Sequence, residues 1–386
     1  MGAGQDQGGE AFLQKLEAAG YLPCDPAILQ PANVFLDLSG EDMRGRLLLA
    51  SDGAADYCLR PEFTIPVSLA YLASPQAGGP AAFSCHGPVF RQRPALAPEF
   101  LQAGLENFGR DDREAADAEI LALALEAASE SFGDSSKPRR DSGDWRIRVG
   151  DAGLLTALLE KLELPPVWLR RIRGGLAKGQ KLDVIFQPAR DEAADHSGVL
   201  AALDGADKAG ARALVEDLLK IAGISALGGR TSGEIADRFL EQAELRSGAG
   251  LDGAKRALLA AFFAVEGHPD EASARLRRVF ATAGLDLASE MDCFDQRLNF
   301  LAARGIDLDA IHFSAGFARN LDYYTGFVFE AVEAGAPESA PVVAGGRYDR
   351  LLSTLGARSA IPAVGAAIWI ERLNPLPGMS QREREQ

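Results

Sequence analysis

One stretch of the sequence combines a carboxylate and a hydroxyl at strand spacing. In Leu59-Arg-Pro-Glu-Phe-Thr-Ile-Pro66, alternation along a strand would place Glu62 and Thr64 on the same face. A carboxylate and a hydroxyl that point together can bind a small polar or charged ligand. The alternative without a ligand is that Arg60 and Glu62 form a cross-strand ion pair at the surface.

A second stretch repeats this arrangement. In Gln102-Ala-Gly-Leu-Glu106, a strand would place Gln102, Gly104 and Glu106 on one face, and the glycine would leave space between the two polar groups. Such a gap could admit a small polar ligand.

Two later stretches add cationic and aromatic groups. Ala318-Arg-Asn-Leu-Asp-Tyr-Tyr-Thr-Gly326 and Ala344-Gly-Gly-Arg-Tyr-Asp-Arg350 bring an arginine, tyrosines and a turn that the glycine pair permits. Polar groups of both signs beside aromatic walls suit a zwitterion. The same residues could instead form a structural ion network, core aromatics and an ordinary hairpin turn. Periodicity does not choose between these readings.

The elements that must position these residues follow from hydrophobic spacing and from breaker residues. Prolines 23, 26 and 31 indicate an extended path, and the loop 133–143 is polar and rich in breakers. Helices are expected at 10–19, 114–128 and 152–162. Strands are expected at 46–50, 57–66, 81–92, 145–149, 311–317, 326–332 and 364–370.

The distribution of these elements predicts an α+β fold in which an antiparallel sheet is flanked by helices. Residues 1–164 and 265–375 form the two parts of the core, and residues 376–386 form a tail. The segment 165–264 between the two parts is rich in alanine, leucine and charge, which indicates a mainly helical insertion.

Composition excludes several classes of protein. The 386 residues carry 40 Lys+Arg against 55 Asp+Glu, a net charge of −15 that disfavours general binding to nucleic acid or to an anionic membrane. The chain has no run of eighteen apolar residues and no signal-peptide pattern at its start, so we expect a cytoplasmic protein without a membrane partner.

Metal and dinucleotide sites also have little support. The four cysteines and four histidines are scattered without zinc-site spacing, so we expect free thiols and no metal. Gly248-Ala-Gly-Leu-Asp-Gly253 matches a dinucleotide fingerprint, but the charged segment before it does not resemble a buried strand. We interpret it as a turn between helices.

Six motifs in order resemble those of histidyl-tRNA synthetases. They are Leu59-Arg-Pro-Glu-Phe-Thr, Gly87-Pro-Val-Phe-Arg, Gln102-Ala-Gly-Leu-Glu, Arg319-Asn-Leu-Asp-Tyr-Tyr, Gly345-Gly-Arg-Tyr-Asp and Glu371-Arg-Leu373. The resemblance implies the core of a class II aminoacyl-tRNA synthetase, which dimerises through a motif 1 region that would lie at 26–35 here. It also implies a histidine pocket, whose residues would be Glu62, Thr64, Gln102, Glu106, Arg319, Tyr323, Tyr324 and Tyr348.

The adenylation residues of that family are altered. The family has Arg-x-Glu in motif 2, where this chain has Arg91-Gln92-Arg93, so the charge beside adenine is reversed. Trp369 stands where the family has a small glycine, and an indole there would fill the adenine slot. Arg91 and Arg372 remain as possible contacts to an anion or a nucleotide.

The sequence ends shortly after Leu373, whereas histidyl-tRNA synthetases continue into an anticodon-binding domain. With the pocket kept and the nucleotide groove altered, the chain is similar to the regulatory subunits of ATP phosphoribosyltransferase. This resemblance implies a catalytically silent histidine sensor, with no cofactor, in a hetero-oligomer with a short-form catalytic subunit. Two alternatives remain open: a truncated synthetase-like enzyme that adenylates histidine, and a scaffold with a vestigial pocket.

Overall fold

The computed structural model describes residues 3–38, 44–94, 96–131, 145–177, 180–187, 226–227, 230–231, 245, 250–317, 324–333 and 341–373. The chain divides into two compact units. One comprises Met1–Leu158 with Ala261–Gln386, and the other comprises Leu159–Ala260.

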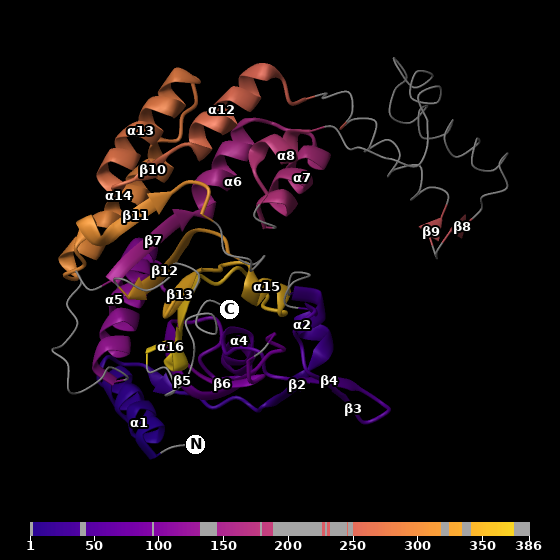
Figure 1. Ribbon diagram of the computed structural model, residues 1–386, viewed down its shortest axis with the longest axis vertical. Helices are drawn as coiled ribbons and strands as arrows, with labels where there is room; N and C mark the ends of the chain where they lie inside the picture. Colours follow the sequence, from indigo (N-terminus) through magenta and orange to yellow (C-terminus); the bar gives the residue numbers. More distant parts are fainter. Residues whose placement is uncertain are drawn as a thin grey trace. The chain divides into compact units, whose positions relative to one another are not determined.

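The first unit is built on a mixed sheet of nine described strands in the order β1-β5-β6-β14-β13-β12-β7-β11-β10 (Figure 1). Neighbouring strands are antiparallel except for the parallel pairs β1–β5 and β7–β11. The strands are β1 (Leu22–Pro23), β5 (Ala81–Phe90), β6 (Glu99–Phe108), β7 (Trp145–Asp151), β10 (Glu266–Gly267), β11 (Ile311–Ser314), β12 (Phe327–Glu333), β13 (Val343–Arg347) and β14 (Ala363–Trp369).

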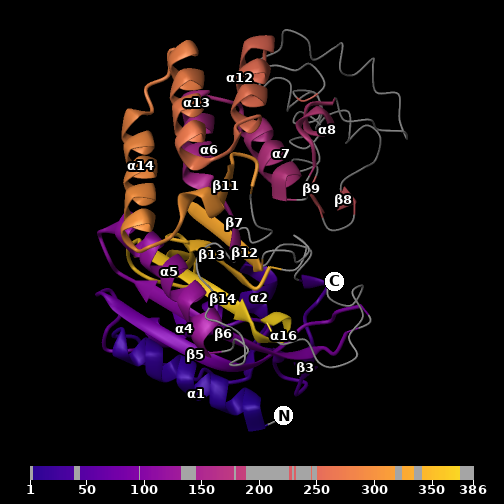
Figure 2. The ribbon, with the colours of Figure 1, turned by 60° about the vertical axis from the view of Figure 1, so that its left-hand side comes forward.

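Helices cover both faces of this sheet. One face carries Leu105, Ala366 and Phe329 and packs against α1 (Ala3–Ala18) and α5 (Arg113–Ser131), and Figure 2 shows α1 running along β5. Helix α14 (Ala288–Ala303) packs on α5 and meets β11 through the rings of Phe294 and Phe313. The other face carries Glu106 and Gln102 and meets α4 (Thr64–Leu72). The remaining helical elements of this unit are α2 (Ala32–Leu38), α6 (Ala152–Lys161), whose last residues belong to the second unit, α13 (Pro269–Thr282), a 3₁₀ turn (Leu308–Ala310), α15 (Leu351–Thr354) and α16 (Ile370–Leu373).

A large apolar core lies over the Glu106 face of the sheet. The ring of Tyr71 stacks on that of Phe108 with centroids 4.5 Å apart, and Phe83 meets both rings at steeper angles. Burying several aromatic side chains contributes much of the stabilisation of a core of this kind. The polar side chains on this face are therefore surrounded by apolar material.

A small sheet in the order β2-β4-β3 accompanies the large one. Its strands are β2 (Leu29–Pro31), β3 (Leu49–Ser51) and β4 (Asp56–Leu59). Arg60, 2% exposed, follows β4 and ties this sheet to β1 and β5, because its guanidinium donates to Pro88 O at 2.9 Å, to Asp25 Oδ1 at 3.2 Å and to Pro26 O.

In the second unit the described helices are α7 (Pro166–Ala177), α8 (Leu182–Phe186) and most of α12 (Gly253–Phe263), with a pair of two-residue strands, β8 (Ala226–Leu227) and β9 (Arg230–Thr231). The expected boundaries at 164 and 264 stay predictions, because most of the expected helical insertion lies outside the described residues. The expected loop 133–143 and the tail 376–386 also lie outside them.

Most of the expected elements of the core are confirmed. The helices expected at 10–19, 114–128 and 152–162 correspond to α1, α5 and α6, and the strands expected at 81–92, 145–149 and 364–370 correspond to β5, β7 and β14. The four cysteines are free, with two buried and two half-buried. Among the described helices, none has the length and apolar character needed to cross a membrane.

The strand expected at 57–66 is wrong in its second half. It ends at Leu59, and Thr64 begins the helix α4, with Phe63 as its N-cap in the αR region. The Glu62 carboxylate accepts hydrogen bonds from the backbone amides of Thr64 and Ile65, which satisfies free donors at the start of the helix. Glu62 and Thr64 still meet at one place, but through a capped helix start and not through alternation along a strand.

The glycine pair 345–346 does not form a turn. Both residues lie inside β13, between β12 and β14. A Cβ on Gly345 would overlap the carbonyl oxygen of Gly365 and lie 2.9 Å from Ala366 Cα. The glycine is therefore required because the backbone of β14 approaches too closely for a side chain.

We expect Gly345→Ala to lower the free energy of unfolding by roughly 1–3 kcal/mol, since the strand backbone cannot move aside without breaking its ladder. Urea denaturation followed by circular dichroism measures this loss. Gly174→Ala in α7 is the control: no described atom lies within 4 Å of the added methyl group, and alanine favours a helix. An equal loss in both variants would contradict the close-approach argument.

Candidate functional site

Glu106 is the centre of the candidate site. Its side chain is buried on β6, where Oε1 accepts a hydrogen bond from Thr64 Oγ1 at 2.7 Å and Oε2 accepts one from the hydroxyl of Tyr348. A Cβ on Gly365 of the neighbouring strand would overlap this carboxyl group. The glycine thus provides the space that Glu106 occupies.

Glu62 lines the site and also holds it together. Its Oε1 accepts from the Ile65 amide at 2.9 Å and its Oε2 from the Thr64 amide at 2.5 Å. These bonds fix the first turn of α4, and the Thr64 hydroxyl is thereby directed at Glu106. The sequence analysis paired Glu62 with Thr64 through alternation along a strand, whereas the structure brings them together through the capping bonds at the start of α4.

Gln102 is 1% exposed, and neither atom of its carboxamide has a hydrogen-bond partner among the described residues. It lies across from Gly87 on β5 and from Trp369 on β14. A buried amide without partners costs about 1–3 kcal/mol. A polar ligand on this face of β6 would recover that cost.

The pKa of Glu106 is raised to about 8, chiefly by burial and also by the negative charge of Glu62, while the hydroxyls of Tyr348 and Thr64 act in the opposite direction. Burial also raises the pKa of Glu62, against the amide bond from Ile65, the positive charge of Arg91 and the bonds from Thr64. Two neighbouring buried carboxyl groups favour a cationic ligand, because a positive charge would stabilise the ionised form of both.

Of the remaining predicted pocket residues, the structure describes only Tyr324. Tyr324 is half-buried, and its ring lies over Gly346, where a Cβ would be 2.9 Å from it. Arg319 and Tyr323 lie outside the described residues. The structure thus brings Glu62, Thr64, Glu106 and Tyr348 into contact, and it places Gln102 on the same strand face as Glu106.

The reversed charge at position 93 is neutralised within the protein. The Arg93 guanidinium binds the Glu371 carboxylate through two nitrogens, one of them at 3.3 Å from Oε2, and it lies 4.0 Å over the ring of Phe100. It also donates to Ala97 O at 2.9 Å through Nε. This pair joins the motif 2 segment directly to Glu371-Arg-Leu373, the last of the six motifs.

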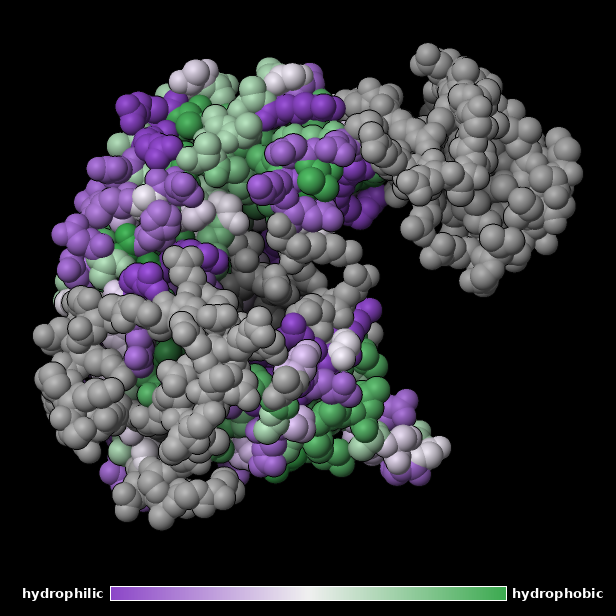
Figure 3. Space-filling view, viewed as in Figure 1, coloured by the Kyte–Doolittle hydropathy of each residue, from purple (hydrophilic) through white to green (hydrophobic). Residues whose placement is uncertain are grey.

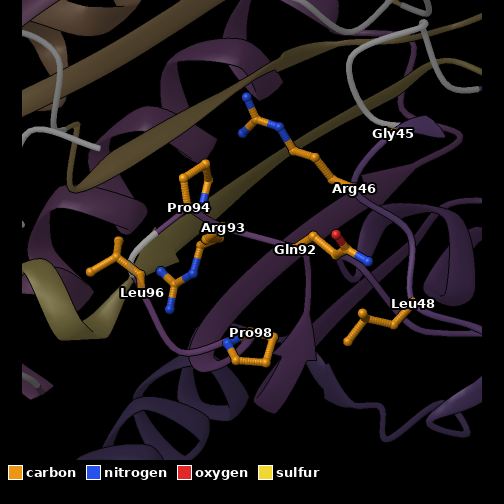
Figure 4. Close-up of a pocket in the computed structure, with 8 residues that line it drawn as sticks. All are labelled: Gly45, Arg46, Leu48, Gln92, Arg93, Pro94, Leu96 and Pro98. Atoms are coloured by element: carbon orange, nitrogen blue, oxygen red, sulfur yellow. The ribbon is translucent and has the colours of Figure 1, made fainter.

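A pocket of about 510 Å³ lies beside this pair (Figure 4). Figure 4 shows the Arg93 guanidinium directed toward Leu96 and Pro98 and the Arg46 guanidinium directed away from them. The described lining residues are Gly45, Arg46, Leu48, Gln92, Arg93, Pro94, Leu96 and Pro98.

The two predicted anion contacts are engaged with the backbone. Arg91 donates through Nε to Pro61 O at 2.6 Å, and Arg372 donates through Nη1 to Pro341 O at 2.6 Å. The Arg372 guanidinium also lies 5.1 Å from the centre of the Trp369 ring. In the part of the chain that the structure describes, no cluster of His, Cys, Asp or Glu could hold a metal ion.

Sequence reasoning missed two residues of the site. Cys85 lies over Gly104, its thiol 3.5 Å from Gly104 O, so the space expected beside that glycine is filled. Gly365 carries no chemistry of its own, yet it makes room for Glu106. A glycine inside an otherwise apolar strand is a signal that could have indicated a large side chain on the neighbouring strand above it.

Comparison with known proteins identifies the family. The family model "Histidyl-tRNA synthetase" matches residues 6–214 and 208–373. A protein of Mesorhizobium japonicum named "ATP phosphoribosyltransferase regulatory subunit" is 40% identical over 91% of this chain and 92% of its own length. Proteins of the same name from Allorhizobium ampelinum and Brucella canis are 37% and 38% identical, over 94% and 92% of this chain and 95% and 93% of theirs. The chain belongs to the ATP phosphoribosyltransferase regulatory subunit family, a branch with the histidyl-tRNA synthetase fold. It is therefore a regulatory and not a catalytic subunit.

Solved structures agree on the fold. A Bacillus halodurans protein titled "ATP phosphoribosyltransferase regulatory subunit/histidyl-tRNA synthetase" superposes with a TM-score of 0.62 at 18% identity, covering 96% of this chain and 78% of that one. The histidine–tRNA ligase subunit of Alicyclobacillus acidocaldarius gives 0.55 at 23% identity, covering 96% and 91%. The expected class II synthetase-like core is confirmed.

We expect the free energy of unfolding to fall as the pH rises from about 5 to about 8, because folded Glu106 keeps a proton that the unfolded chain has released. This stabilisation is complete below the unfolded pKa and is lost as the pH passes the folded value of about 8. Glu106→Gln should flatten this part of the profile, measured by denaturant unfolding at several pH values.

The matched control is Glu99→Gln, an exposed carboxylate on the same strand, which should leave the profile unchanged. Of the other groups near Glu106, the thiol of Cys85 does not titrate in this range, since burial raises its pKa well above the ordinary value. A profile as steep in Glu106→Gln as in the original protein would show that another group controls it.

Proposed function

We propose that this protein is the histidine-sensing regulatory subunit of ATP phosphoribosyltransferase, acting in the cytoplasm. It is required for the activity of a short-form catalytic subunit and mediates inhibition of that activity by histidine. The observation that carries the proposal is the buried Gln102 carboxamide without a partner, on the same face as the buried carboxyl of Glu106.

The chemistry of the site matches a free histidine. Glu62 and Glu106 suit the ammonium group and a protonatable imidazole, and Gln102 supplies both a donor and an acceptor. The ligand carboxylate requires a cation, which we assign to Arg319, and the aromatic walls to Tyr323, Tyr324 and Tyr348. No cofactor enters this proposal.

The nucleotide side of the site supports binding without adenylation. Arg93, Glu371 and Phe100 form one packed group at the position where the synthetase family binds adenine, and Arg372 lies against Trp369. Accommodating ATP there would require breaking an ion pair that is largely shielded from water.

Self-association would use the small sheet and the segment before it. Ile28, Leu29 and Leu49 are 42%, 48% and 61% exposed, and Figure 3 shows hydrophobic side chains gathered over the region where Figure 1 places α2, β2 and β4. An exposed group of aliphatic side chains favours contact with a second copy. This region includes residues 26–35, where the resemblance to class II synthetases puts the dimer contact.

The proposal is tested by co-expressing the chain with a short-form catalytic subunit and measuring ATP phosphoribosyltransferase activity with and without histidine. We expect activity only when both chains are present, and inhibition by histidine. Gln102→Leu should remove inhibition and histidine binding by calorimetry while leaving activation intact. Its melting temperature should not fall, because the variant loses a buried amide without partners.

Two results would contradict the proposal. Full activity and full inhibition without this chain would remove the regulatory role. Robust histidine-dependent ATP–pyrophosphate exchange by this chain alone would favour an adenylating enzyme instead. Gln76→Leu, at an exposed position beyond α4, is the control for the loss of a glutamine and should retain inhibition.

Leu49→Glu should weaken self-association at least tenfold, because a carboxylate would be buried without a partner in the contact. Sedimentation equilibrium of the isolated chain measures this change. Phe300→Glu, on a similarly exposed apolar position of α14, should leave the association unchanged. Equal association of both variants and the original would place the dimer contact elsewhere.

A further inference from the structure

A buried network of charged side chains lies on the face of the sheet opposite to Glu106. It joins helices α5 and α14 to the ends of β7 and β13. Its members are Asp117, Asp151, Arg297 and Arg347, each at most 9% exposed, together with the partly buried Asp349.

Asp117 is the centre of this network and has no exposed surface. Its Oδ2 accepts from Arg297 Nε at 2.8 Å, and its Oδ1 accepts from Arg347 Nε at 2.9 Å and lies 2.7 Å from Arg347 Nη2. Both oxygens are therefore used by guanidinium groups. An asparagine at this position would present an amide N–H to one arginine, so it cannot replace the carboxylate.

Arg347 carries the network to the end of β13. Its Nη1 donates to Asp349 Oδ1 at 2.9 Å, and that oxygen also accepts from the Ala363 amide at 2.9 Å. The Asp349 amide donates to Thr325 Oγ1 at 3.0 Å, and the Thr325 amide donates to Arg347 O at 2.8 Å. The two residues that flank Tyr348 are thus fixed by charge as well as by backbone bonds.

Tyr348 lies between these two anchors, and its hydroxyl donates to Glu106 on the other face of the sheet. We propose that Asp117 is a positioning residue for the histidine site: by holding Arg347, and through it Asp349, it fixes the Tyr348 hydroxyl on the Glu106 carboxyl. This inference rests on the proposed function only for the identity of the ligand, since the contacts belong to the protein itself.

The second arm of Asp117 reaches the start of α6. Arg297 Nη1 donates to Asp151 Oδ2 at 2.8 Å, and Asp151 Oδ1 accepts from the amides of Gly153 and Leu154 at 2.8 and 3.1 Å. Asp117 is therefore connected through Arg347 to the Tyr348 segment, and through Arg297 and Asp151 to the first turn of α6. A shift of Tyr348 on ligand binding would be felt at that helix through Arg347, Asp117 and Arg297.

The test is a double-mutant cycle of Asp117→Asn and Tyr348→Phe, with histidine affinity measured by calorimetry. Each single variant should weaken binding about tenfold, as expected for a hydrogen bond to a charged group. The double variant should be no weaker than the weaker single variant, because both act on the same contact. Multiplied losses, near a hundredfold, or a loss below twofold in Asp117→Asn, would overturn the proposal.

A second measurement needs no ligand. In the absence of histidine, the upper pH limit of the stability change that Glu106→Gln removes reports the pKa of Glu106, which the Tyr348 hydroxyl lowers; this subtraction is needed because burial also raises the pKa of Glu62. The titratable groups next to Glu106 are those of Glu62, Cys85 and Tyr348. Asp117→Asn and Tyr348→Phe should both raise this pH, and the double variant should raise it no further. An unchanged value in Asp117→Asn would refute the positioning role, even if the protein did not bind histidine.

Two further variants complete the design. Asp349→Asn breaks the same arm at a less buried position, so it should reproduce both effects to a smaller degree and serves if Asp117→Asn does not fold. Asp292→Asn removes an arginine-paired carboxylate of α14, at 64% exposure and bound to Arg277 outside this network, and should change neither readout. If the original protein shows no histidine binding, the proposed function fails while the pH measurement still decides the role of Asp117.

Discussion

The site depends on one arrangement, the burial of the Glu106 carboxyl group between two hydroxyl donors. A carboxyl group in a nearly dry environment is expensive unless its oxygens are hydrogen-bonded. Thr64 can donate only because Glu62 caps the start of α4, and Tyr348 can donate only because β13 ends where Arg347 is held. The glycine at 365 then provides the volume, so four separate segments of the chain are specified by a single buried group.

The two faces of the sheet carry different kinds of polar structure. On the Glu106 face, the carboxyl oxygens of Glu62 and Glu106 accept hydrogen bonds, but the buried Gln102 carboxamide has no partner among the described residues. On the opposite face, Asp117 and its arginines are satisfied by one another. Breaking a buried pair of this kind is costly, so the second network gives the first a rigid frame.

The motif 2 segment shows how a reversed charge can be neutralised within the protein without large changes. An arginine in place of a glutamate could have been left facing an open groove, but Glu371 neutralises it and Phe100 covers it. The alteration of motif 2 is therefore compensated by a residue nearly three hundred positions away. Such a pair is consistent with a family whose members are named as regulatory subunits and not as ligases.

Hydrophobic spacing by itself predicted α1, α5, α6 and the main strands, because their patterns extend over enough residues to identify the period. It failed at Thr64, where a helix starts on a side-chain cap from Glu62, and at Gly345, where a neighbouring strand backbone and not a turn explains the glycine.

Motifs indicated which residue types form the candidate site. They carried no information on which groups satisfy one another, since those partners come from distant segments and become neighbours only when the sheet assembles. The motifs alone thus identified residues 62, 64, 102, 106 and 348 as candidates for the site. Only the tertiary structure decided that Gln102 is left without a described partner, that Arg93 is paired with Glu371, and that Asp117 supports Tyr348 from the opposite face.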